Sequence, residues 1–142
     1  MKTILYLNQR THNWESIRGK IPCKNIHLTN FNDVKPFVGS AIFPDVENIF
    51  MDSCDGNFVN YWVNWLTFPN AKNLYLKSHF SDPKVLSQKF KSINVHEDFK
   101  TYADHWPRSN ARIITDAEYD QAVNSFTEIP PYKFNIFSIE QE

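Results

Sequence analysis

The sequence is poor in glycine and in cysteine. It has 3 Gly and 2 Cys among 142 residues, against 8 Pro. Because glycine supplies the positive φ angles of many tight turns, we expect proline to end most elements instead. Two cysteines, Cys23 and Cys54, are too few for a disulfide framework, so we expect two free, buried thiols. Such cysteine usage indicates an intracellular, reducing location.

The sequence also lacks an excess of either charge and any long apolar run. The 15 Lys and Arg against 16 Asp and Glu give a formal net charge of −1. Nucleic-acid binding needs a basic surface, so no nucleic-acid partner is predicted. No stretch approaches the ~20 apolar residues of a membrane span. The opening MKTILYLNQR has only four consecutive apolar residues, which indicates a strand and not a signal peptide. We therefore expect no membrane association.

Residue patterns for metal binding and catalysis are absent as well. The 5 His form no H-x-x-x-H or H-E-x-x-H pair, and the cysteines form no C-x-x-C, so no metal site is predicted. Cys54 follows a predicted strand, as some nucleophiles do, but Asp52 and Asp55 beside it would raise the pKa of its thiol. No glycine-rich phosphate turn follows any block. We expect no catalytic residue, no enzyme activity and no cofactor.

What the sequence does contain is a repeated apolar pattern. The blocks 46–51 and 71–76 each follow a Phe-Pro pair, and each has small or apolar residues at positions one, four and six. With position four as the anchor, the pattern recurs at intervals of 19 to 25 residues. The anchors are Leu5, Ile26, Ile49, Leu74, Ile93 and Ile113. We predict a strand at each anchor and a single domain over residues 1–129.

The segments between the blocks read as short helices. Residues 58–66 place large apolar side chains at i, i+3, i+4, i+7 and i+8, the spacing of one helical face. Asp82 followed by Pro83 predicts the start of a helix over 83–90. Thr115 and Glu118 form a capping box that opens a helix reaching Phe126. Residues 130–142 begin with two prolines and then alternate apolar with polar residues, so we predict an extended C-terminal tail.

These blocks resemble the leucine-rich-repeat superfamily, in a short and divergent form. The resemblance implies an α/β fold: a short, irregular stack with a parallel sheet on one side and short helices on the other. The family usually has Asn or Cys at position nine, and among the first five blocks only Cys54 keeps this pattern. The Asn-, Phe- and Ile-rich composition is also similar to that of small proteins of amoeba-infecting large DNA viruses. This second resemblance implies the cytoplasm or nucleus of a host cell, or association with a virion.

A doubly wound, open α/β sheet of the flavodoxin type is the alternative, with residues 2–7 as its first strand. A βαβ unit of such a fold needs about 30 residues, which is more than the 19 to 25 that separate the anchors here. This alternative would make the protein a small enzyme or a nucleotide-binding domain.

Position five of each block predicts a binding face. In a parallel stack, neighbouring strands lie about 4.8 Å apart, so the residues at this position form a column: Tyr6, His27, Phe50, Tyr75 and Asn94. The first four carry aromatic rings, and an exposed aromatic strip is typical of an interaction surface. We therefore expect a non-enzymatic binding or assembly protein whose partner is another protein or a second copy in a homodimer. The other interpretation is that the C-terminal tail folds back over the strip.

Overall fold

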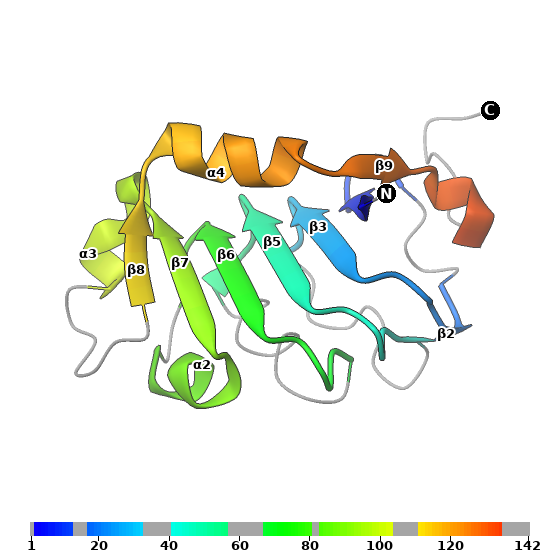
Figure 1. The fold of residues 1–142 in the computed structure, drawn as a ribbon, viewed down its shortest axis with the longest axis horizontal. Helices are drawn as coiled ribbons and strands as arrows, with labels where there is room; N and C mark the ends of the chain where they lie inside the picture. Colours follow the sequence, from blue (N-terminus) through cyan, green and yellow to red (C-terminus); the bar gives the residue numbers. More distant parts are fainter. Residues whose placement is uncertain are drawn as a thin grey trace.

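The computed structural model describes residues 2–12, 17–32, 41–56, 67–80, 83–103 and 111–134, which form a seven-stranded parallel sheet (Figure 1). The strands, in sequence order, are β1 (Thr3–Asn8), β3 (Asn25–Thr29), β5 (Asn48–Asp52), β6 (Asn73–Lys77), β7 (Ser92–His96), β8 (Ala111–Ile114) and β9 (Thr127–Ile129). A separate pair of two-residue strands, β2 (Gly19–Lys20) and β4 (Ala41–Ile42), lies among the connections.

The strand register follows the predicted repeat through five blocks. Their anchors pair in turn across the sheet, from Leu5 to Ile93. At the sixth block Ile93 pairs with Ala111 and not with Ile113, so the predicted register is wrong there by two residues. A shift of two leaves each side chain on its face of the sheet, because side chains alternate with a period of two.

The anchors and the residues two positions after them face the main core of the molecule, on a side that we call the core face. The described connections cover this face with further apolar side chains. The two Phe-Pro pairs, which are repeated in the sequence, are also neighbours in the fold. The rings of Phe43 and Phe68 stack with their centroids 5.0 Å apart. Helix α2 (Pro83–Lys89) contributes the fully buried Leu86. The repeat therefore builds one continuous hydrophobic core.

The strand order distinguishes the two predicted folds. The six strands from β1 to β8 lie side by side in the order of the sequence, whereas a flavodoxin-like sheet has the order 2-1-3-4-5. The flavodoxin-type alternative therefore does not describe this fold. Right-handed crossovers that always advance in one direction stay on one face, and the result is a parallel, solenoid-like stack with few helices among the described connections.

The scarcity of glycine shows at one turn of the repeat. Asn30 and Ser53 each follow their strand by one residue, and both have positive φ angles of 60° and 57°. Asparagine adopts this left-handed conformation more readily than most residues. The same backbone turn therefore recurs after β3 and β5 without glycine.

The two helices predicted from cap residues both form, although Asp82, the cap predicted for the first, lies outside the described residues. Helix α2 ends at Lys89, and helix α4 (Asp116–Asn124) begins at the capping box. There Glu118 N donates to Thr115 Oγ1 at 3.1 Å, while Thr115 N donates to Glu118 Oε1 at 2.9 Å. The helix predicted over residues 58–66 lies outside the described residues. No helix in the described part of the chain is long and apolar enough to cross a membrane.

The end of the described chain differs from the prediction. After β8, helix α4 crosses the sheet on the side opposite the core face, which we call the outer face, and leads to β9 beside β1 at the far edge (Figure 1). A crossover that reverses direction but keeps its handedness has to use the opposite face. The tail predicted to be extended from residue 130 instead begins with a 3-10 turn, η3 (Pro131–Phe134).

Candidate binding face

A ladder of side-chain hydrogen bonds runs along the amino ends of the strands on the outer face. Ser92 Oγ donates to Asn73 Oδ1, Asn73 Nδ2 to Asn48 Oδ1, and Asn48 Nδ2 to Asn25 Oδ1, at 2.7–2.8 Å. Asn25 Nδ2 completes the ladder by donating to the Thr3 carbonyl at 2.8 Å. Every donor points the same way, so the bonds polarise one another. Asn25, Asn48 and Asn73, each directly before its anchor, thus tie neighbouring strands together.

The predicted column forms next to this ladder. Tyr6 pairs with His27, His27 with Phe50, Phe50 with Tyr75 and Tyr75 with Asn94. The rings of Tyr6 and His27 meet edge to face at 5.3 Å, and those of Phe50 and Tyr75 stack at 4.3 Å. The adjacency predicted from position five of the repeat is therefore confirmed.

The expectation that this column is exposed is wrong at its centre. Helix α4 lies over Phe50, which is 1% exposed, and the rings of Tyr119 and Phe126 contact it edge to face at 6.0 and 5.9 Å. The Tyr119 hydroxyl donates to the Met51 carbonyl at 3.3 Å and so anchors the helix to β5. The cover is α4, and the sequence carried its signal in the apolar residues that follow the capping box.

The remaining column residues differ in their surroundings. Asn94 is also buried, and its Oδ1 accepts from Arg112 Nε at 3.4 Å. Tyr6, His27 and Tyr75 are half-buried, and the Tyr6 hydroxyl accepts hydrogen bonds from Asn8 Nδ2 and Thr29 Oγ1. The predicted face therefore reaches the surface on both sides of Phe50, at Tyr6 and His27 over β1 and β3 and at Tyr75 over β6.

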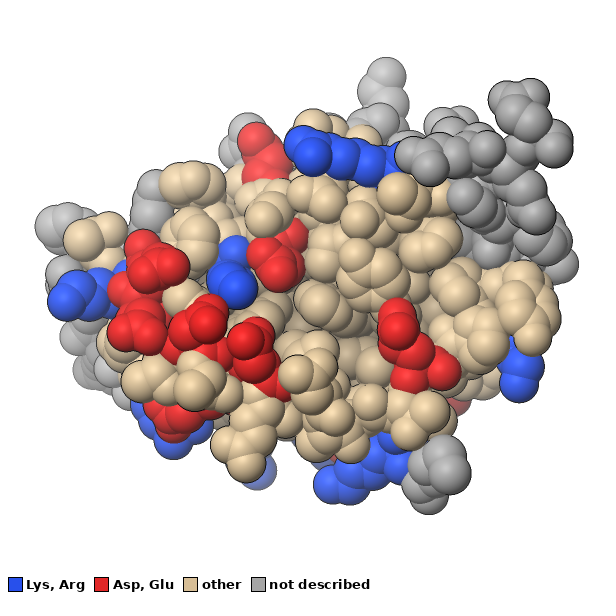
Figure 2. Space-filling model, turned by 90° about the horizontal axis from the view of Figure 1, so that it is seen from above, with Lys and Arg blue, Asp and Glu red and all other residues tan. Residues whose placement is uncertain are grey.

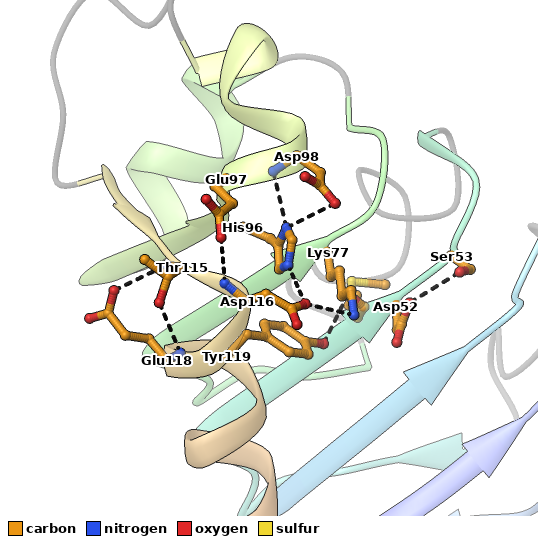
Figure 3. A network of polar contacts seen from close by, with 11 residues as sticks. Asp52, Ser53, Lys77, His96, Glu97, Asp98, Thr115, Asp116, Glu118 and Tyr119 are labelled. Atoms are coloured by element: carbon orange, nitrogen blue, oxygen red, sulfur yellow. Dashed lines mark hydrogen bonds and ion pairs between the residues drawn. The ribbon is translucent and has the colours of Figure 1, made fainter.

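A polar cluster that sequence reasoning missed fixes the start of α4 (Figure 3). His96, at the end of β7 and 1% exposed, lies with Nε2 at 2.7 Å from Asp116 Oδ1. Its Nδ1 accepts from Asp98 N at 3.0 Å, which assigns the ring proton to Nε2. Lys77 Nζ lies 3.3 Å from the same Asp116 oxygen, and Glu97 Oε2 accepts from Asp116 N at 2.7 Å.

This cluster, which we call the His96 clamp, joins the start of α4 to the end of β7. Hydrogen bonds from His96 and then from Lys77 lower the pKa of Asp116, so the carboxylate stays charged. Both nitrogens of His96 are engaged, so its ring has no free atom with which to take a proton from a substrate. The clamp holds α4 across the sheet and therefore sets the position of the cover.

Helix α4 leaves two neighbouring recesses on the outer face, one on each side of Phe126. The first, of about 430 Å³, lies over the middle of β1 and β3. It is lined by Ile4, Tyr6, His27, Val123, Asn124, Phe126 and Glu128. The second, of about 370 Å³, lies at the amino ends of β1, β3 and β5. It is lined by Lys2, Thr3, Lys24, Asn25, Glu47, Asn48 and Phe126.

His27, a half-buried histidine, forms part of the wall of the first recess. Its ring lies between Tyr6 and Phe50, and its Nε2 is buried without a hydrogen-bond partner among the described residues. Burial lowers the pKa of His27 to about 4, the charge of Asp52 opposes this shift and that of Lys77 adds to it. At neutral pH the recess therefore has a neutral, aromatic wall.

The cysteines are free and buried, as predicted. Burial raises the pKa of each thiol to about 12, so neither is a thiolate at neutral pH. Cys54 Sγ lies 3.5 Å from the Leu28 carbonyl of the preceding strand. No group of three or more His, Cys, Asp or Glu side chains that could hold a metal ion occurs within the described ranges.

Acidic side chains gather at one end of the outer face, around η2 (Glu97–Phe99) and the first turns of α4 (Figure 2). Those that the sequence places there are Glu97, Asp98, Asp116, Glu118 and Asp120, all exposed. Lysines line the second recess, near the opposite end of the helix. The second recess also has one carboxylate, Glu47, and Glu128 lines the first.

Comparison with known proteins places the chain in a family. No solved structure matches it significantly. An uncharacterized protein of Acanthamoeba polyphaga mimivirus is 32% identical over 145 aligned residues, which cover 100% of this chain and 97% of that protein. A second uncharacterized protein of the same virus is 30% identical over 114 residues, or 80% of this chain and 82% of the relative. These relatives support a viral origin. A model of a family of unknown function matches residues 26–107, and the chain belongs to this family, DUF5845.

Proposed function

We propose that this protein is a non-enzymatic binding or assembly protein that engages a partner protein through its outer face. One observation carries the proposal: α4 covers the centre of the aromatic column but leaves two recesses that flank Phe126. Concave sites with apolar walls and a few polar groups are where proteins hold ligands. The contact surface in this proposal is the groove beside α4 and not the whole column.

The described polar groups support binding over catalysis. The connection after β8 crosses the outer face, whereas Phe99, which follows β7, packs on the core side. Open α/β sheets bind ligands at such a change of face, but here His96 and Asp116 bond directly across it. The thiols of Cys23 and Cys54 are buried and protonated. The groove is the outer-face feature that remains open to a partner.

The stack itself is, in this proposal, a divergent relative of leucine-rich repeats. Two features support this relation: the asparagine ladder links successive strands, and Cys54 at position nine contacts the backbone of the preceding turn. Proteins built from stacked repeats use extended surfaces to bind partners.

The experiment is partner capture with matched charge variants. The purified protein and its Lys24→Glu variant are immobilised and exposed to lysate of amoebae infected with the virus. Lys20→Glu on β2 is the control, because this exposed lysine lies outside the two recesses. We expect a protein that is captured by the wild type and by Lys20→Glu but not by Lys24→Glu, and that binds again when both proteins are purified. Equal capture by all three would refute the groove as the binding surface.

The same variants test the enzyme alternative. Added nucleotides and common cofactors would raise the melting temperature if the native protein bound them. A clear shift that Lys24→Glu abolishes would replace the protein-binding proposal by a small-molecule site.

A further inference from the structure

We propose that the two recesses form one groove for an extended peptide segment that carries an apolar side chain and, three positions along, an acidic one. This inference rests on the proposed function and names the chemistry of the partner. Phe126 lines both recesses, so the two lie next to each other on the outer face of β1 and β3.

The recess at the amino ends of the strands selects an anion. Lys2 and Lys24 line it against one carboxylate, Glu47, and no ion pair joins either lysine to another described residue. Asn25 and Asn48 each use Nδ2 once in the ladder, and an amide nitrogen has two hydrogens. Two ammonium groups and the spare amide hydrogens together suit a carboxylate oxygen.

The recess on the other side of Phe126 selects an apolar side chain. Ile4, Val123 and the rings of Tyr6 and His27 supply its walls, and His27 is uncharged at neutral pH because burial holds its pKa near 4. His27 Nε2 is buried and has no hydrogen-bond partner among the described residues, so the ring meets the segment through its apolar surface. Burial of a large apolar side chain here would supply most of the affinity.

The spacing of the two recesses sets the conformation of the segment. Lys24, which directly precedes β3, and His27 within β3 are three residues apart, which corresponds to about 10 Å at ~3.3 Å per residue. In a β-strand, positions i and i+3 point to opposite sides. In polyproline II geometry they point to the same side and lie about 9 Å apart. The groove therefore fits a polyproline II segment with its two recognition residues at i and i+3.

The test uses two labelled peptides, acetyl-Ala-Pro-Phe-Pro-Pro-Glu-Ala-amide and its reverse sequence, because the groove does not fix the direction of the chain. Fluorescence anisotropy would measure their affinity for the wild type. We expect one of them to bind saturably, about tenfold or more tightly than the matched peptides with Gln for Glu or Ala for Phe. The Lys2→Glu/Lys24→Glu variant should bind about tenfold more weakly, and Lys24→Arg and Lys20→Glu should bind like the wild type.

The outcomes separate this inference from the proposed function. Circular dichroism checks that each variant folds, so that weaker binding can be attributed to the changed side chains in the groove. If neither peptide binds saturably, or if the Gln peptide binds equally well, the inference fails. The proposed function still stands in that case if Lys24→Glu loses capture of a partner from lysate and Lys20→Glu keeps it. If both variants capture the partner as the wild type does, the proposed function fails together with the inference.

Discussion

Asp116 Oδ1 lies 2.7 Å from His96 Nε2, and this contact joins the first turn of α4 to the end of β7. The two residues are twenty positions apart in the chain. His96 ends β7, and Phe99 just after it packs against the main core, whereas Asp116 begins α4 on the outer face. Their bond therefore fixes the direction in which α4 leaves β8, and with it the position of Tyr119 over Phe50.

The clamp predicts a large loss of stability in His96→Ala. The change leaves a cavity under α4 and removes the acceptor for Asp98 N, so the free energy of unfolding should fall by about 2–4 kcal/mol. Urea denaturation followed by circular dichroism measures it. The exposed Asp120→Asn on the same helix is the control and should leave the midpoint unchanged. Identical midpoints for the two variants would show that the clamp does not stabilise the fold.

The cover predicts that Phe50 is a core residue. Phe50→Ala should lower the free energy of unfolding by about 3–5 kcal/mol, the usual cost of removing a buried Phe ring, whereas Tyr75→Ala, at a half-buried position, should cost less. Phe50→Asp should fail to fold, because the carboxylate would be buried without a partner. Thermal denaturation of the three variants ranks their stabilities. A folded Phe50→Asp variant with native helix content would mean that α4 leaves the sheet readily and that the column is an exposed binding face after all.

The asparagine ladder predicts position-dependent costs. Asn48→Ala leaves Asn25 Oδ1 without its donor and Asn73 Nδ2 without its acceptor, so it should cost about 2–4 kcal/mol. Ser92→Ala removes only the first donor of the ladder and should cost about 1 kcal/mol. Urea denaturation of both variants and of the double variant tests this. Equal costs for Asn48→Ala and Ser92→Ala would show that the bonds act independently of their place in the ladder.

The repeat could be predicted from sequence because its signal is local. Each of the five strands from β1 to β7 carries its own apolar pattern, and β3, β5 and β6 each have an asparagine directly before the anchor. The register of the column from Tyr6 to Asn94 therefore follows from counting along the chain. The sixth block was placed two residues late because Ala111 is a weak anchor and Ile113 a strong one. The predicted face of each side chain in this block was still correct, because a shift of two residues along a strand does not change the face.

The candidate site could be predicted only in part, because it depends on a long-range return. The capping box at Thr115 predicted the start of α4, and the apolar stripe from Tyr119 to Phe126 predicted that one side of the helix is buried. Neither feature says which face of the sheet it covers. That choice follows from β9, three residues long and without a strong strand pattern, which pairs with β1 at the other end of the sheet.

His27 predicts a pH-dependent stability. Its pKa in the folded state is about 4, against 6.5 ordinarily, so the unfolded chain binds the proton more tightly and acid favours unfolding. The contribution is complete above pH ~6.5 and is lost as the pH falls toward 4, up to about 3 kcal/mol at 1.36 kcal/mol per pKa unit. His27→Phe keeps an aromatic ring beside Tyr6 and Phe50 and should flatten the urea-midpoint profile between pH 7 and 4, whereas the exposed His79→Gln should keep it. A wild-type midpoint that stays constant over this range would contradict a buried, neutral His27.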